Sequence, residues 1–157
     1  MSEEGKRRLL SKDVSAFVKT GGELPLSNRG QVELLRGITE RGKSFRLRVL
    51  GSSMSPFIRD NDILTLAPIH DRPPDVGDVV AFVRPETGWL RIHRIIGRQH
   101  DGWLLRGDNC PESDGIFRLH EIVGRVTRIE RNGGAYRFGQ GSEARLIAWF
   151  QRAGVLL

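Results

Sequence analysis

The sequence predicts a mainly β fold, a curved antiparallel sheet or partly open barrel, with a short helix at each end. Apolar and polar residues alternate in several short segments after residue 45, and loops rich in glycine, proline and aspartate separate these segments. The 157 residues include 38% hydrophobic residues, 28% charged residues, 19 glycines and 7 prolines. This length and composition indicate one globular domain with many turns.

The first 44 residues are expected to form a polar arm followed by a short helix. Residues 1–28 are polar and basic, and residues 11–19 could form at most a short helix. A clearer helix is predicted between Asn28 and Gly42, because Ser27 or Asn28 can cap its start and the apolar residues recur at near-helical spacing.

From Phe45 the period of the apolar residues changes to two, which is typical of half-buried strands. Strands are predicted at residues 45–49, 63–66, 79–83, 89–96, 103–106 and 122–129 within a β domain of residues 45–139. The last segment, residues 140–157, is expected to be a helix from Ser142 to Arg152 that packs on this domain. Ser142 would cap it, and one side would carry Leu146, Ile147, Trp149 and Phe150.

The charge and cysteine content exclude several classes of protein. The formal net charge is +6, and the basic residues are spread along the chain, so we interpret them as a solvated surface. Nucleic acid is not an expected partner, although a weak contact of the last helix with an anionic membrane surface stays open. The single cysteine, Cys110, excludes an internal disulfide and a cysteine-based zinc site.

No apolar run approaches the ~18 residues that cross a bilayer. The polar N-terminus does not fit a secretory signal. We therefore expect a cytoplasmic protein, with a peripheral position at the membrane as the alternative.

A turn after the first predicted strand carries the first chemical motif, Gly51-Ser52-Ser53-Met54-Ser55-Pro56. It resembles the nucleophile box of type I signal peptidases and of the related repressor peptidases, in which the serine before methionine attacks the substrate carbonyl. The resemblance implies that Ser53 is the nucleophile and that its backbone N–H stabilises the oxyanion. Many family members have a serine two residues before the nucleophile, where this chain has Gly51, so a second oxyanion donor stays open.

A serine hydroxyl needs a nearby group that accepts its proton. All four lysines precede Ser53, whereas the base of signal peptidases follows the serine. His93 lies in Ile92-His93-Arg94-Ile95-Ile96, which resembles the corresponding strand of the endoplasmic-reticulum and archaeal signal peptidases, which use a Ser/His arrangement. An ordinary imidazole is mostly neutral at pH 7, so His93 is the predicted general base.

The segment from Arg106 to Asp114 resembles the Gly-Asp-Asn motif that closes the active site of signal peptidases. The resemblance implies that Asp114 orients His93. Asp108 is the competing acidic residue, although building the turn suits it better. Ser113 matches a serine that helps to position the base in the bacterial enzymes, and Ser52 and Gly51 are further supporting residues.

The resemblance covers about residues 45–128 and implies that the sheet is of the signal peptidase and LexA-like type. It also implies a serine endopeptidase that cuts an extended peptide segment after a small residue, as in signal peptide processing by bacterial proteins. One alternative is a self-cleaving LexA-like repressor, which would need a helix-turn-helix domain and normally a lysine base. A non-catalytic peptide-binding module of the same fold is another. Cys110 is a weaker candidate nucleophile. We expect no cofactor and no metal ion, because the other histidines, His70, His100 and His120, form no ligand motif.

Overall fold

A computed structural model of the chain describes residues 24–25, 29–137 and 139–154. The short helix expected at residues 11–19 lies outside the described residues. Two α-helices are described, α2 (Arg29–Glu40) and α3 (Glu143–Arg152), together with a short 3₁₀ turn at Leu119–Glu121. The strands are β1 (Leu24–Pro25), β2 (Phe45–Arg48), β3 (Ile63–Ala67), β4 (Val79–Val83), β5 (Leu90–Gln99), β6 (Gly102–Arg106), β7 (Gly115–Phe117), β8 (Ile122–Arg131) and β9 (Gly134–Tyr136).

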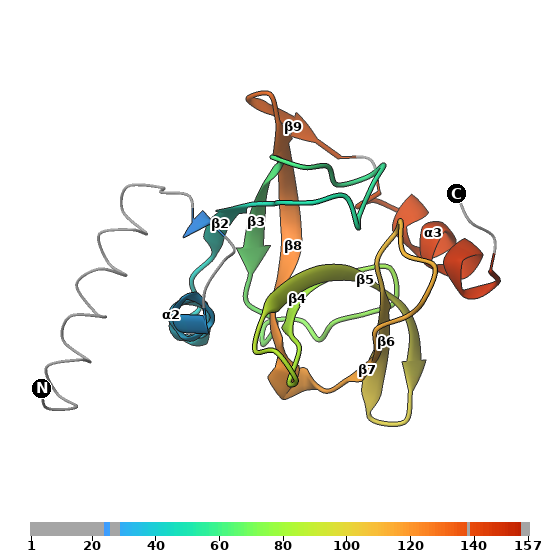
Figure 1. Ribbon diagram of the computed structural model, residues 1–157, viewed down its shortest axis with the longest axis horizontal. Helices are drawn as coiled ribbons and strands as arrows, with labels where there is room; N and C mark the ends of the chain where they lie inside the picture. The colour runs from blue at the N-terminus through green and yellow to red at the C-terminus, as the bar shows by residue number, and fades with distance from the viewer. Residues whose placement is uncertain (1–23, 26–28, 138, 155–157) are drawn as a thin grey trace, which may run out of the picture.

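One curved sheet contains all of these strands, in the order β1-β2-β3-β8-β4-β5-β6-β7, with β9 paired to β8 (Figure 1). Every pairing is antiparallel except that of β1 with β2, which is parallel. Among the described strands, β1 and β7 do not pair with each other, so the sheet is not closed into a barrel. The expected mainly β fold with a curved, largely antiparallel sheet and two short helices is confirmed.

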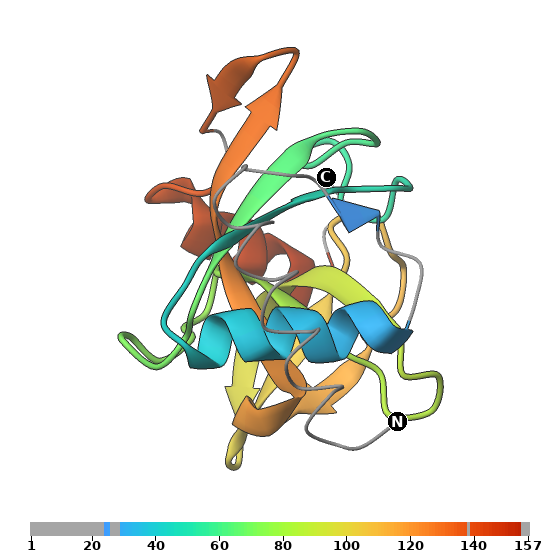
Figure 2. The ribbon, with the colours of Figure 1, turned by 90° about the vertical axis from the view of Figure 1, so that its left-hand side faces the viewer.

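Alternation along the strands buries one set of side chains under α2. Helix α2 lies across the sheet near β2 and β8 (Figure 2). It contributes Leu35 and Ile38, which are 1% and 0% exposed, to an apolar cluster that also contains Phe45 and Leu47 of β2. Each such buried side chain stabilises the fold by about 1.5–3 kcal/mol. This cluster reaches the start of the loop after β2, so it supports the segment that carries Ser53.

Helix α3 packs against β5 through a different face from the one expected. Its buried residues are Ala144, Ile147, Ala148 and Gln151. Leu146 and Trp149 are 55% and 61% exposed, so the prediction that they share the packed side is wrong. The two small alanines lie one turn apart on the buried face, and small side chains allow a helix to approach a sheet closely.

The start of α3 also differs from the prediction. Ser142 occupies the N-cap position, but its side chain makes no capping hydrogen bond. The carboxylate of Glu143 instead accepts the backbone N–H groups of Gly139 and Gly141. An acidic side chain in the first turn also interacts favourably with the helix dipole.

The strand predictions were correct in place, although those for β5 and β8 ended too early. Strands β5 and β8 each span ten residues, and the three-residue strands β7 and β9 were not predicted. Three residues contain too little alternation to be recognised without a partner strand. Among the described residues, none of the helices combines the length and the apolar character needed to span a lipid bilayer.

Candidate active site

The chain leaves β2 in a tight turn that presents Ser53. Gly51 has a φ of 100°, a conformation that side-chain-bearing residues rarely adopt. Its N–H donates to Asp60 Oδ1 at 2.8 Å, and the N–H of Ser55 donates to the carbonyl of Ser52 at 3.1 Å. Met54, the next residue after Ser53, is 2% exposed. The turn is therefore anchored on both sides of a half-buried serine.

The loop that carries Ser53 ends at Asp62, which connects this loop to β8. Asp62 is 2% exposed and accepts the N–H of Arg59 at 2.8 Å. Its two carboxylate oxygens also accept donors from Arg131 of β8, at 2.9 and 2.8 Å. A bidentate arginine pair is among the stronger polar contacts, so β8 fixes the end of the loop that carries Ser53.

His93 lies in the middle of β5, opposite Val80 of β4, and is 2% exposed. Its Nε2 lies 3.1 Å from Ser53 Oγ, and its Nδ1 lies 2.5 Å from Asp114 Oδ2. The ring also packs against Phe82, with 5.7 Å between the ring centroids. A proton on Nδ1 that is donated to Asp114 leaves Nε2 free to accept the proton of Ser53.

Asp114 is placed beside His93 by the backbone of the loop before β7. Its N–H donates to the carbonyl of Leu105 at 2.8 Å, and its side chain is 7% exposed. Burial raises the pKa of Asp114, but hydrogen bonds from His93 and Arg84 outweigh the burial, and the pKa of this carboxyl lies below its usual value. Asp114 is therefore a carboxylate near neutral pH.

The Gly107-Asp108-Asn109 loop holds the nucleophile turn from the other side. The N–H of Asn109 donates to the carbonyl of Ser53 at 2.8 Å, and its side-chain amide donates to the carbonyl of Ser52 at 3.2 Å. The N–H of Asp108 points to the sulfur of Met54 at 3.4 Å. These contacts determine where Ser53 lies relative to β5.

Asp108 lies close in sequence to the site but does not contact His93. Its carboxylate is fully buried and pairs with Arg94 at 2.8 and 2.7 Å, while Gln151 of α3 donates to it at 2.5 Å. Arg94 follows His93 on β5 and therefore points to the opposite face of the sheet. The expected turn-building role of its side chain is wrong, because that side chain is a partner in a buried ion pair.

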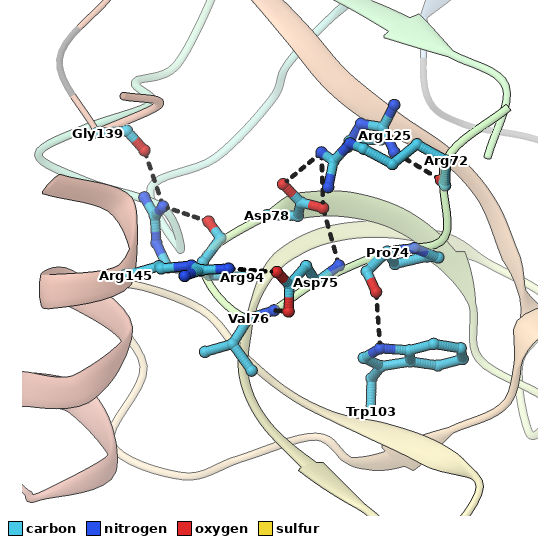
Figure 3. A network of polar contacts seen from close by, with 11 residues as sticks. Arg72, Pro74, Asp75, Val76, Asp78, Arg94, Trp103, Arg125, Gly139 and Arg145 are labelled. Carbon is cyan, nitrogen blue, oxygen red and sulfur yellow. Dashed lines mark hydrogen bonds and ion pairs between the residues drawn. The ribbon is translucent and has the colours of Figure 1, made fainter. Parts of the chain in front are cut away.

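Arg94 extends this buried network to two loops. Its Nη1 donates to the carbonyls of Gly77 and Gly139, at 3.0 and 2.8 Å (Figure 3). The side chain of Arg94 is 0% exposed. Because its charge is paired and its donors are hydrogen-bonded, this buried arginine connects the loop before β4 with the segment before α3.

The remaining predicted site residues have other positions. Ser113 is exposed, and among the described residues its hydroxyl makes no hydrogen bond to His93. Ser52 is exposed and contributes its carbonyl, not its hydroxyl, to the site. Cys110 lies beside Ser53, with Sγ 3.8 Å from its carbonyl oxygen. Burial, with a smaller effect of Asp114, raises the pKa of the Cys110 thiol, which weakens it as a nucleophile.

Sequence reasoning missed Arg84, Arg94 and Gln151 as parts of this region. Arg94 lies in an otherwise apolar strand segment, and this position could have marked it as a buried arginine. No comparable signal marks Arg84 or Gln151, because their partners are 30 and 43 residues away in the chain.

Gly107 leaves room for the contact between Ser53 and His93. A Cβ atom at this position would lie 2.5 Å from Cys110 Sγ, 2.7 Å from the carbonyl oxygen of Ser53 and 2.9 Å from His93 Nε2. We therefore expect Gly107→Ala to displace the serine and histidine and to lower the rate of any reaction at Ser53 by about 10²-fold or more. Steady-state rates of the purified variant, with circular dichroism as a check on folding, measure this effect.

Gly37→Ala in α2 is the matched control for this substitution. A Cβ there meets nothing within 4 Å, and alanine favours a helix over glycine by about 1 kcal/mol. Gly37→Ala is expected to leave the rate unchanged. A Gly107→Ala protein as active as the Gly37→Ala protein would show that the site tolerates a methyl group between Ser53 and His93.

One comparison with known proteins found a match. A family model described as Peptidase S24-like matches residues 10–127. This match contains the turn of Ser53, strand β5 with His93, and the loop with Asp114. No curated protein matches the chain.

Proposed function

The chain belongs to the Peptidase S24-like family, and from this premise we propose that it is a serine endopeptidase with a Ser53, His93 and Asp114 triad. The observation that carries the proposal is the pair of contacts on His93, 3.1 Å from Nε2 to Ser53 Oγ and 2.5 Å from Nδ1 to Asp114 Oδ2. The use of histidine as the base resembles the endoplasmic-reticulum and archaeal signal peptidases within the wider superfamily.

In the proposed reaction, His93 Nε2 removes the proton of Ser53 as Oγ attacks the scissile carbonyl. Asp114 holds the ring in the required tautomer and stabilises the imidazolium that forms. His93 then gives the proton to the leaving amine, and the C–N bond breaks to leave an acyl group on Ser53. Water, deprotonated by the same histidine, hydrolyses this ester and regenerates the hydroxyl.

The oxyanion of the tetrahedral intermediate needs fixed donors. Within the described residues, the backbone N–H groups of Ser52 and Ser53 donate to no protein acceptor, although the carbonyls on both residues are held by the Asn109 loop. We assign these two N–H groups as the oxyanion donors, so that Gly51 contributes the conformation of the turn and no side-chain donor.

An extended peptide is the proposed substrate because, among the described strands, only β4 pairs with residues 90–92 of β5. Residues 90–92 pair with β4 on one side, whereas β6 pairs with β5 only from Arg94 onward. A peptide strand added at this edge would run beside His93. A small residue before the scissile bond is what the resemblance to signal peptidases implies.

Self-cleavage is the second candidate, and one observation favours it. Strand β1, from the N-terminal part of the chain, pairs in parallel with β2, the strand that leads to Ser53. A segment of the same chain therefore lies on the sheet near the nucleophile turn. In this version the protein would cut its own N-terminal part as a LexA-like protein, whereas a non-catalytic module would cut nothing.

Digestion of a proteome-derived peptide mixture, followed by mass spectrometry, tests the first candidate. We expect new peptide ends with a small residue before the cut, and these ends should be missing after incubation with Ser53→Ala. Intact mass measured over time on the protein alone tests the second candidate. A protein that cuts neither the mixture nor itself would support the non-catalytic alternative.

A further inference from the structure

Arg84 contacts Asp114 of the proposed triad and lies in the hairpin between β4 and β5. The backbone of Arg84 forms two hydrogen bonds within this hairpin. Its N–H donates to the carbonyl of Trp89 at 3.1 Å, and its carbonyl accepts the N–H of Gly88 at 2.7 Å. These bonds continue the ladder between β4 and β5, the strand that carries His93. The position of Arg84 is therefore determined by the same pair of strands as the position of His93.

The guanidinium of Arg84 and the ring of His93 share one carboxylate. Arg84 Nη2 donates to Asp114 Oδ1 at 2.8 Å, while His93 Nδ1 lies 2.5 Å from Oδ2. The side chain of Asp114 is 7% exposed and that of Arg84 is 34% exposed. With both oxygens occupied, the carboxylate cannot rotate away from His93 without losing a charge-assisted hydrogen bond.

The placement of Arg84 is not what stability alone would favour. Its Nε is buried and, among the described residues, has no hydrogen-bond partner. A buried donor without a hydrogen-bond partner lowers the stability of the fold, and such unfavourable groups occur most often at functional sites. The compensating contact is the one with Asp114, which raises the pKa of Arg84.

The cation also changes how Asp114 acts on His93. Its positive charge offsets part of the carboxylate charge that faces the imidazole ring. The acidic groups that act on Arg84 are Asp114 and Glu86, and the charged groups that act on Cys110 beside Ser53 are Asp114, Arg91 and Arg106.

We propose that Arg84 is a positioning residue that clamps Asp114 against His93 and offsets part of the carboxylate charge there. The proposal rests on the proposed function for its catalytic meaning, but the clamp itself can be measured without any substrate. Arg84 acts through Asp114 and does not touch the reacting atoms.

The test is a pH titration of the imidazole signals by NMR, with the His93 signal assigned from its loss in His93→Gln. Without the cation, the full charge of Asp114 is left to the imidazolium. We therefore expect the titration midpoint of His93 in Arg84→Gln to move up by about 0.5 to 1 pH unit. Arg84→Lys keeps a cation with poorer geometry and should restore part of the shift. An unchanged midpoint in Arg84→Gln would overturn the proposal.

Activity gives the second readout, with a peptide taken from the Ser53-dependent cuts in the peptide mixture. The acidic limb of kcat/KM in Arg84→Gln should move in the same direction as the midpoint, and the plateau should fall by about 10-fold through lost positioning. Arg72→Gln is the matched control, because Arg72 pairs with Asp78 at 3.0 Å in another exposed loop (Figure 3). It should leave both the midpoint and the plateau unchanged.

The outcomes separate this proposal from the proposed function. If the wild-type protein cuts no peptide but the His93 midpoint still shifts, the clamp stands and the peptidase assignment fails. If peptides are cut through Ser53 while Arg84→Gln keeps the wild-type midpoint and profile, the peptidase assignment stands and the clamp fails.

Discussion

Ser53→Ala is expected to lower kcat/KM for peptide cleavage by at least about 10⁴-fold, because the substitution removes the atom that attacks the carbonyl in the proposed reaction. The cost to stability should be small, since within the described residues Ser53 Oγ makes one hydrogen bond, to His93, and the turn is held through backbone contacts. His93→Ala should cause a comparable loss and Asp114→Asn a smaller one. Because triad members act as a unit, the double variant Ser53→Ala/His93→Ala should be no slower than either single variant.

The measurement is the initial rate of cleavage of one fluorogenic peptide by each purified variant. Ser55→Ala is the matched control, because Ser55 lies in the same turn and forms its hydrogen bond to Ser52 through its backbone N–H, which alanine keeps. We expect it to cut at close to the wild-type rate. Full activity in Ser53→Ala would rule out the serine mechanism. The cleavage would then come from a contaminating enzyme or from another residue.

Asp108→Ala is expected to destabilise the fold by about 3–5 kcal/mol, because it leaves the guanidinium of Arg94 buried without a counter-charge. Arg94 is 0% exposed, so water cannot replace the lost carboxylate without a local opening of the structure. Gln151 of α3 loses its acceptor in the same variant. For a chain of this length, such a loss corresponds to a fall in Tm on the order of 10 °C.

Chemical denaturation followed by tryptophan fluorescence measures this loss of free energy of unfolding. Asp75→Ala is the matched control, since the pair of Asp75 with Arg145 has a short contact of 2.6 Å but both side chains are more than half exposed (Figure 3). Exposed pairs contribute at most about 1 kcal/mol. If Asp108→Ala does not fold, Asp108→Asn, which keeps the shape and an acceptor, should still fold and be intermediate in stability. Equal stabilities of Asp108→Ala and Asp75→Ala would contradict the role of the buried pair.

Much of the fold was predictable because strands leave a local signal. The alternation of Phe45 and Leu47 with arginines predicts a half-buried strand, and the structure has a strand at Phe45–Arg48. The order of the motif boxes, read through the family resemblance, also brought Ser53, His93 and Asp114 forward as candidates. The geometry places these three side chains in one chain of contacts.

Other features could not be predicted, because they depend on which strands become neighbours. Strand β8 lies between β3 and β4, although it follows both of them by many residues. This arrangement lets Arg131 hold Asp62 across 69 positions of the chain. Local periodicity says which face a residue takes but not which distant segment meets that face.

The amino-acid sequence by itself determined the class of fold and, through its motifs, the nucleophile and the base proposed here, since these depend on local pattern and residue type. Only the tertiary structure shows which of the two acidic residues contacts His93. His93 and Arg94 are adjacent on β5 and therefore point to opposite faces of the sheet. Asp114 meets His93 on one face, and Asp108 is buried with Arg94 on the other. The pairing of β4, β5 and β6 also brings Arg84 to Asp114, which no spacing along the chain could have indicated.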